Sequence, residues 1–186
     1  MSGQLIGADI LEDVPAAVRP AVTWAAVIAV GYAAVGAACG WIWASRYTAP
    51  SGVVYDHTWY PDEWDAGQRT IFAATGSFVV IAAIAGLVLG LAAVLIPRAT
   101  EVPTLVGVIV GSVLATGLML WVGLQLGPSA PAAAAATAAD GTALDGGLTT
   151  PGWAAWTALP LASLVVLCVV YLMVPARAAG DSSDEE

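Results

Sequence analysis

The sequence contains four long apolar stretches without a single charged residue, and this feature limits the possible folds more than any other. They run from about 20 to 43, 70 to 96, 102 to 126 and 153 to 174. About 20 helical residues cross the hydrocarbon layer of a membrane, and in lipid each segment must satisfy its own backbone hydrogen bonds. Charged residues make up only 10% of the chain, against about 25% in soluble proteins. The sequence therefore predicts an all-α polytopic membrane protein, a bundle of four transmembrane helices.

The segments around these stretches define the predicted domain organisation. We expect an acidic N-terminal segment over residues 1–19, a transmembrane domain over 20–175 and an acidic tail over 176–186. Two long loops, 44–69 and 127–152, fall at the same end of the bundle because successive spans alternate in direction. The second loop is rich in alanine, glycine and proline. That composition predicts a flexible linker without a core of its own.

Two local signals predict how the spans run. Residues 97–101 leave so little room between the second and third stretches that these should form an antiparallel hairpin. Pro160 lies inside the fourth stretch, where a proline removes a helix hydrogen bond and should kink the helix.

The arginines and tryptophans predict the orientation. Arg19, Arg98 and Arg177 fall on the side of the two termini, whereas Arg46 and Arg69 fall on the side of the long loops. The positive-inside rule then favours cytoplasmic termini in the cell membrane, with both long loops outside. Tryptophans concentrate at membrane interfaces, and seven of them fall at the predicted outer boundary: Trp41, Trp43, Trp59, Trp64, Trp121, Trp153 and Trp156.

Small residues recur at every fourth position in all four spans. Such spacing places them on one helix face, where backbones approach closely. We therefore expect helix-packing faces, available to the other spans, to a membrane-protein partner or to a second copy of the chain. The residues are Gly36, Gly40, Ala82, Gly86, Gly90, Gly107, Gly111, Ala115, Ala154, Ala158 and Ala162.

The loop 44–69 is the most chemically mixed part of the chain. His57, Asp62, Glu63 and Asp65 are residue types that bind divalent cations, so an outward metal or substrate site is one reading. An interfacial helix explains the same residues and is the reading we favour. Pro61 suits the first turn of a helix, and the acidic residues behind it complement the positive helix end.

Several kinds of chemistry are absent from the sequence. No motif places a serine or cysteine beside the only histidine as a nucleophile and base, and we predict no enzymatic activity and no cofactor. Five arginines, no lysine and a net charge of −9 disfavour nucleic-acid binding. Cys39 and Cys168 fall at predicted depths that differ by roughly 16 Å, which excludes a disulfide between them.

Short motifs at the ends of the spans give the chain a resemblance to a known group. They are Gly40-Trp41-Ile42-Trp43 with Ala49-Pro50, Gly76-Ser77-Phe78, Pro103-Thr104-Leu105 with Gly107 and Gly111, and Leu126-Gly127-Pro128. Over residues 36–175 the chain resembles small actinobacterial four-span membrane proteins catalogued as a domain of unknown function. The resemblance implies a cell-membrane location in a Gram-positive-like envelope, and it implies no activity. The chain departs from the group in having few basic residues around its second and third spans.

Three functional hypotheses follow. The leading one is a non-enzymatic accessory or scaffold component of the cytoplasmic membrane, with the lipid bilayer as its surroundings and the small-residue helix faces open to a membrane-protein partner or a second copy. The second is a conduit for a small solute or ion that acts as an oligomer. It is less favoured because spans that move ions or protons usually hold an ionisable residue, and these four hold none. The third is an outward-facing sensor of divalent cations or of the envelope.

Overall fold

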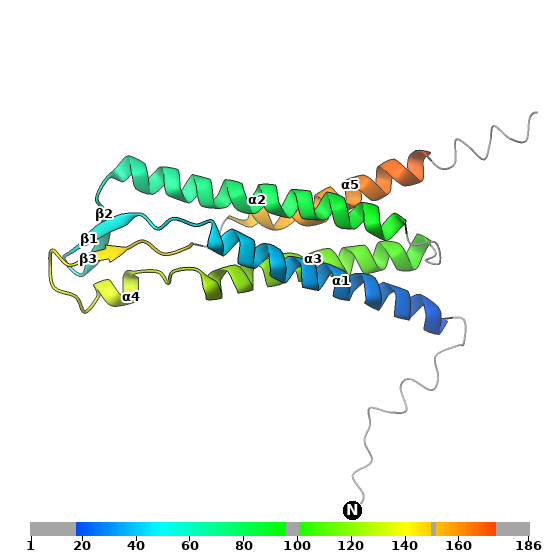
Figure 1. Ribbon diagram of the computed structural model, residues 1–186, viewed down its shortest axis with the longest axis horizontal. Helices are drawn as coiled ribbons and strands as arrows, with labels where there is room; N and C mark the ends of the chain where they lie inside the picture. The colour runs from blue at the N-terminus through cyan, green and yellow to red at the C-terminus, as the bar shows by residue number, and fades with distance from the viewer. Residues whose placement is uncertain (1–17, 96–100, 150–151, 174–186) are drawn as a thin grey trace, which may run out of the picture.

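The computed structural model describes residues 18–95, 101–149 and 152–173, and these form a long helical bundle with a small cap at one end (Figure 1). The side chains of the predicted acidic segments 1–19 and 176–186 lie outside the described part of the chain, and so do those of Arg19, Arg98 and Arg177 of the orientation argument. The elements in chain order are α1 (Val18–Ser45), β1 (Ser51–Tyr55), β2 (Thr58–Pro61), α2 (Trp64–Val94), α3 (Glu101–Leu126), α4 (Ala132–Ala135), β3 (Ala143–Asp145), η2 (Trp153–Thr157) and α5 (Ala158–Met173).

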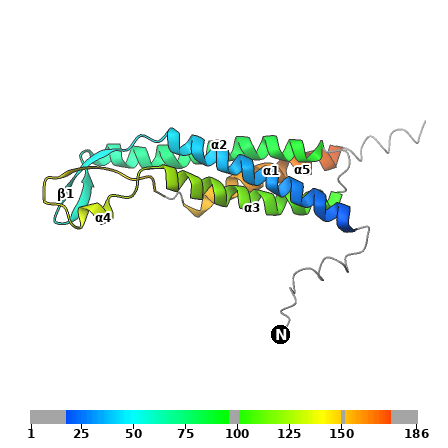
Figure 2. The ribbon, with the colours of Figure 1, turned by 60° about the horizontal axis from the view of Figure 1, so that its bottom comes forward.

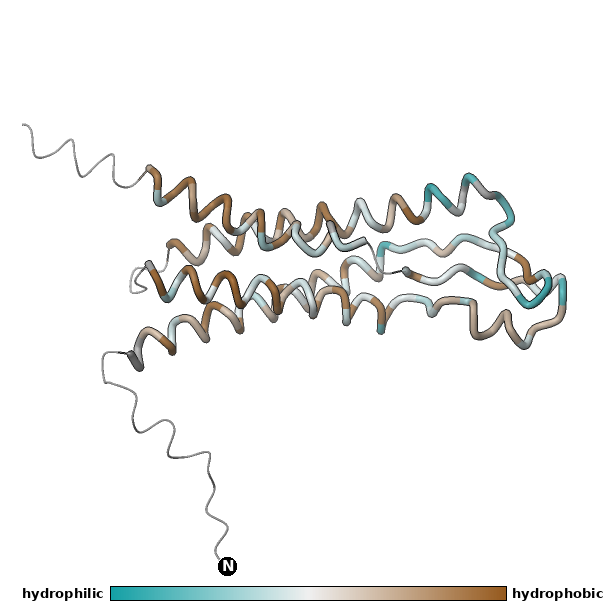
Figure 3. Tube along the Cα trace, turned by 180° about the vertical axis from the view of Figure 1, so that it is seen from behind, coloured by the Kyte–Doolittle hydropathy of each residue, from teal (hydrophilic) through white to brown (hydrophobic). Residues whose placement is uncertain are grey.

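Four helices are long and apolar enough to cross a membrane. They cover Ala21–Ser45, Gly67–Val94, Val102–Leu126 and Ala155–Met173, close to the four predicted stretches. Hydrophobic residues dominate these helices, whereas hydrophilic ones gather at the cap and the start of α2 (Figure 3). The prediction of an all-α bundle of four membrane-spanning helices is confirmed.

The helices pair in a way that skips one neighbour in the chain. The two most extensive helix contacts join α1 to α3 and α2 to α5, and smaller contacts join α3 to α5 and α1 to α2. In each close pair the two helices run parallel, as Figures 1 and 2 show. Helices α2 and α3 do run antiparallel, but they contact each other little. The two helices therefore run antiparallel as predicted, but the glycine-lined faces fit together across the α1–α3 and α2–α5 pairs.

Glycines bring the backbones together in both close pairs. A Cβ atom on Gly36 would lie 2.6 Å from the Ala115 Cα atom, and one on Gly111 would lie 3.0 Å from the Ala29 Cα atom. In the other pair, a Cβ atom on Gly86 would lie 2.5 Å from the Leu159 carbonyl oxygen. Gly40, Gly90 and Gly107 make similar approaches to a neighbouring helix. Helix association in lipid depends on such close fits, since apolar burial against lipid tails gains little.

Three of the five alanines predicted to lie on packing faces are buried in the bundle. Ala82, Ala115 and Ala162 are buried, whereas Ala158 is only half-buried. The side chain of Ala154 lies outside the described part of the chain.

Buried hydroxyl groups of the bundle bond mainly to helix backbone. The Ser163 hydroxyl lies 3.0 Å from the carbonyl oxygens of both Gly86 and Leu159, so it can donate across the α2–α5 contact. Thr116 donates to the Ser112 carbonyl at 2.9 Å. The Tyr32 hydroxyl is buried near Ser163 but makes no hydrogen bond of regular geometry. The buried hydroxyl groups of Ser163 and Thr116 therefore have partners within the bundle itself.

The fourth span begins with a turn of 3₁₀ helix. This turn covers Trp153–Thr157, and Pro160 is the third residue of the α-helix that follows. A proline in the first turn loses no helix hydrogen bond, because the N–H groups there have no partner inside the helix. The predicted kink in mid-span is thus replaced by a change of helix type before Pro160.

The cap consists of residues 46–63 and 127–149, and a three-stranded antiparallel sheet in the order β2-β1-β3 forms its centre. In the register, Val54 pairs with Trp59 and Gly52 pairs with both Pro61 and Leu144. The β-branched and aromatic residues of β1 and β2 favour strands, and side-chain burial alternates along both of them, as in a half-buried sheet. The sheet lies at the end of the bundle away from the start of α1 (Figure 1).

This sheet corrects two predictions about the loops. Pro61 ends a strand, and α2 begins at Trp64 after an uncapped, extended Glu63, so the predicted interfacial helix starts three residues later than Pro61 and continues directly into the second span. The residues before it form a hairpin. The segment 127–149 contributes β3 and α4 and buries Leu148 and Ala135. This segment is therefore part of a folded cap and not the predicted flexible linker. Its glycines allow tight contacts, which cannot be recognised from its alanine-, glycine- and proline-rich composition.

Candidate binding pocket in the cap

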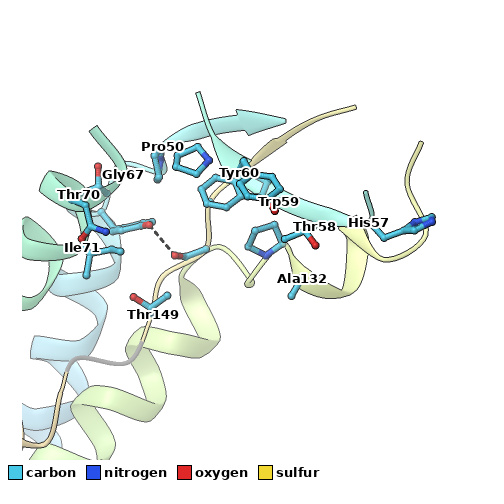
Figure 4. A pocket seen from close by; sticks show the side chains of 16 residues that line it. Pro50, His57, Thr58, Trp59, Tyr60, Gly67, Thr70, Ile71, Ala132 and Thr149 are labelled. Atoms are coloured by element: carbon cyan, nitrogen blue, oxygen red, sulfur yellow. Dashed lines mark hydrogen bonds between the residues drawn. The ribbon is translucent and has the colours of Figure 1, made fainter. Parts of the chain in front are cut away.

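A pocket of about 580 Å³ lies between the cap and the first turns of α2. Its volume is in the range of small-molecule sites. Three segments distant in sequence surround it, and Figure 4 shows His57 at one end and Thr70 and Ile71 at the other. The lining consists of Tyr47, Pro50, His57, Thr58, Trp59, Tyr60, Pro61, Gly67, Gln68, Thr70, Ile71, Pro131, Ala132, Gly146, Gly147 and Thr149.

Trp59 is held in place by a hydrogen bond across the sheet. Its indole N–H donates to the Leu144 carbonyl oxygen at 2.9 Å, and so joins β2 to β3 over the strand between them. Gly52 of that strand makes this possible, since a Cβ atom there would lie 2.6 Å from the Trp59 ring. Gly146 similarly leaves space beside the ring, because a Cβ atom on Gly146 would lie 3.1 Å from Trp59 Cη2. The two glycines therefore allow a rigid aromatic wall for the pocket.

Tyr47 connects the end of α1 to the far segment of the cap. Its hydroxyl donates to the Gly147 carbonyl oxygen at 2.9 Å (dashed line in Figure 4). Gly147 in turn packs against the backbone of Ala130. A Cβ atom on Gly147 would lie 2.5 Å from the Ala130 nitrogen atom. Partial burial raises the pKa of the Tyr47 phenol, so the donating, protonated form persists at ordinary pH.

The hairpin turn at the other end of the pocket has an uncommon backbone. Asp56 and His57 have φ angles of 48° and 56°, as a two-residue type I′ turn requires. Most such turns use Asn-Gly, because other residues are strained at positive φ. The Asp140 carboxylate accepts a hydrogen bond from the Asp56 backbone N–H at 3.0 Å and fixes this turn to the second cap segment.

The pocket lining is largely apolar and holds no carboxylate, thiol, lysine or arginine among its 16 residues. Aromatic rings and prolines supply most of its surface, and threonine hydroxyls, the Gln68 amide and the His57 imidazole supply its polar groups. Such a lining suits an uncharged, mainly apolar ligand that makes a few directional hydrogen bonds.

The predicted cation ligands do not come together. His57 lies in the hairpin turn, and the four residues of β2, about 13 Å of extended strand, separate it from Asp62. Asp62, Glu63 and Asp65 are exposed around the start of α2. In the described part of the chain, no group of three or more His, Cys, Asp or Glu side chains could hold a metal ion. Of the four, only His57 lines the pocket.

The predicted interfacial tryptophans divide into two sets. Trp41, Trp121, Trp153 and Trp156 are exposed at the cap end of the helices, as an interface belt requires. Trp43 is wrong as a belt residue, since it is 1% exposed and its indole N–H donates to the Ala74 carbonyl at 2.9 Å. Trp59 belongs to the sheet, and the side chain of Trp64 lies outside the described part.

Comparison with known proteins leaves the chain without an established relative. No family model, no curated protein and no solved structure matches it. The resemblance to the actinobacterial group therefore stays a prediction, and the pocket must be interpreted from its own chemistry.

Sequence reasoning missed most of the pocket. Tyr47, Gln68 and Thr149 carry no motif, and Pro50 belongs only to a short motif of the resemblance. These residues become neighbours only through contacts across 80 to 100 residues of chain, as the bond from Tyr47 to Gly147 illustrates. One signal was available. Residues 53–55 and 58–60, on the two sides of Asp56-His57, are β-branched or aromatic, and two such runs separated by two residues are typical of a hairpin.

Proposed function

We propose that this chain is a non-enzymatic accessory protein of the cytoplasmic membrane that binds an uncharged, largely apolar ligand in its cap. The observation that carries this proposal is the pocket between the cap and α2, with its aromatic and proline-rich lining. A helix bundle that served only as an anchor would need no such pocket. Ligand recognition on a rigid membrane anchor is typical of accessory components that present or sense a molecule for another protein.

The chemistry of the lining supports a binding role over catalysis. His57 is its single candidate base, and the lining offers no carboxylate to orient the imidazole and no thiol as nucleophile. Catalysis by a nucleophile and base needs such partners within hydrogen-bond reach. The nearest hydroxyl in sequence, that of Thr58, donates to the Asp56 carbonyl oxygen at 3.3 Å.

Two features support a location of the cap outside the cell. Both long loops lie at one end of the bundle (Figure 1), and under the positive-inside rule the arginine distribution favours the other end for the cytoplasm. The exposed Trp41 and Trp121 lie at the cap end, where a tryptophan belt marks an interface.

The contacts between the helices support an accessory role over a conduit. The glycine faces are occupied by other helices of the same chain, as Gly36 against Ala115 shows. Buried hydroxyls such as Thr116 bond to backbone carbonyls and do not line a path. A partner or a second copy of the chain would therefore contact other surfaces than the predicted glycine faces.

The proposal is tested by photocrosslinking in the native membrane from two tyrosine positions. A photoreactive benzoylphenylalanine replaces Tyr60, which lines the pocket, or Tyr55, which is exposed on the same sheet but does not line it. We expect a small-molecule adduct, detected by mass spectrometry of the purified protein, at position 60 and none at position 55. Equal labelling at both positions, or no adduct at either, would overturn the proposed binding role.

The accessory role has a separate test. Purification in mild detergent should retain a partner protein or an oligomer, and a strictly solitary monomer would count against this part of the proposal. Liposomes containing the purified chain should show no flux of small solutes or ions.

A further inference from the structure

We propose that the ligand of the cap pocket is a phospholipid of the adjacent leaflet, which inserts one acyl chain between the cap and α2. This inference rests on the proposed function: the uncharged, apolar group that the pocket takes up is one acyl chain, and the charged headgroup stays outside the lining. It is carried by the depth of the pocket, by its continuity with the membrane-facing surface and by the charges beside it.

Hydrogen bonds and close contacts fix the depth of the pocket. The bond from Trp43 to the Ala74 carbonyl oxygen places these residues at one level. The contact between Gly40 and Met119 places the exposed Trp121 at nearly the same level on α3. Ile71 lies one helical turn further toward the cap, about 5 Å. The inner end of the pocket therefore begins just above the tryptophan belt, within reach of the lipid headgroups.

The pocket is continuous with the surface that faces lipid. Ile71 lines the pocket and is also 50% exposed on the outside of α2. The next residue, Phe72, is 77% exposed at the edge of the same apolar surface. An acyl chain that follows this surface toward the cap meets Ile71 first and then the apolar pocket, without crossing a charged side chain of the lining.

Two arginines are next in sequence to residues that line the pocket. Arg46 directly precedes Tyr47, and Arg69 directly follows Gln68. Both arginines are exposed, and guanidinium groups are well suited to phosphate oxygens. The lining itself is uncharged, so the chain and not the headgroup is what the pocket accommodates. The remainder of the cap surface is rich in exposed carboxylates, including Asp56, Asp62 and Asp145, and disfavours free anions.

The test uses the full chain in nanodiscs of phosphatidylcholine that carries a diazirine at the end of one acyl chain. In an ordinary bilayer these chain ends lie at mid-depth and label the spans, which serves as the internal control. We expect additional label on the cap peptide that contains residues 57–61.

Two phenylalanine variants on the short helix α4 make the test specific. Ala132→Phe fills the pocket from a lining position that is exposed, whereas Ala133→Phe adds the same ring at an exposed position that does not line the pocket. Cap labelling should fall at least fivefold in the first variant and stay unchanged in the second, with span labelling equal in both.

The outcomes separate this inference from the proposed function. Labelled spans with an unlabelled cap would overturn the lipid assignment, and a small-molecule adduct at position 60 would then still support binding of another apolar ligand. Equal loss of cap label in both variants would also overturn the assignment, because the label would then report the fold of α4 and not the pocket.

Discussion

The bundle and the cap are held together by different kinds of contact. In the bundle, specificity comes from missing side chains, since Gly36 and Gly86 let two helix backbones approach. In the cap, it comes from side chains that bond to distant backbone carbonyls, as Trp59 does to Leu144 and Tyr47 to Gly147. The contrast follows from the surroundings of each part. Lipid offers no hydrophobic driving force between helices, whereas water at the cap demands that each buried polar group finds a partner.

Trp43 lies where the two regions meet, and its removal should have the largest effect. Trp43→Ala removes a buried ring that packs edge-on against Phe78, with centroids 5.0 Å apart, and donates to Ala74. We expect a loss of about 3–5 kcal/mol in the free energy of unfolding, measured by reversible unfolding in mixed micelles. Trp41→Ala, at a position 61% exposed, is the control and should cost less than about 1 kcal/mol. Similar losses in the two variants would show that Trp43 does not hold the bundle end to α2.

Alanine at two glycines of α1 should act in opposite directions. Gly36→Ala places a methyl group against the Ala115 backbone, whereas nothing lies within 4 Å of a Cβ atom at Gly31. Overpacking should cost about 1–3 kcal/mol at position 36, and improved helix propensity should stabilise position 31 by up to about 1 kcal/mol. Thermal unfolding in one detergent compares the two variants. Stabilisation by Gly36→Ala would contradict close backbone packing as the basis of the α1–α3 pair.

The cap should respond to the loss of one hydroxyl by about 1 kcal/mol. Tyr47→Phe removes the donor to Gly147 and leaves that carbonyl without the phenol. Hydrogen exchange in residues 146–149 should quicken while exchange in α3 stays unchanged. Tyr55→Phe, at an exposed position on the sheet, is the matched control. Faster exchange along α3 as well would show that cap and bundle unfold as one unit.

Alkaline pH sharpens the same prediction. Burial raises the pKa of Tyr47 in the folded cap above its unfolded value near 10. The folded state thus keeps its proton longer, and the contribution of this group is fully present below pH 10 and is lost as the pH rises through the folded pKa. Protection of residues 146–149 should fall over that range in the wild-type chain, and Tyr47→Phe should remove this component.

The sequence predicts the bundle well because lipid imposes a simple rule on it. Apolar length alone locates the spans, and glycines at four-residue spacing indicate the packing faces. Which faces meet is decided by contacts such as Gly111 with Ala29 and Tyr32, and spacing cannot rank such fits. The short turn at 97–101 predicts the antiparallel course of α2 and α3, but it does not predict which helices pack most closely.

The cap was harder to predict because its strands are short and one of them lies 80 residues further along the chain. Gly52 and Gly146 look like loop residues in the sequence, yet they leave the space that Trp59 occupies. Asp56 and His57 adopt positive φ angles, which are uncommon for residues other than glycine, although Asp and His adopt them more often than most. Tertiary contacts such as that of Asp140 with the turn therefore override the local preference.

The pairing of α1 with α3 and of α2 with α5 has a consequence for biosynthesis. Helix α1 meets its main partner, α3, only after α2 has also been inserted, and α2 meets α5 only after α3 has been inserted. The glycine surface of α1 therefore stays in contact with lipid or with the insertion machinery until α3 arrives, and that of α2 until α5 arrives.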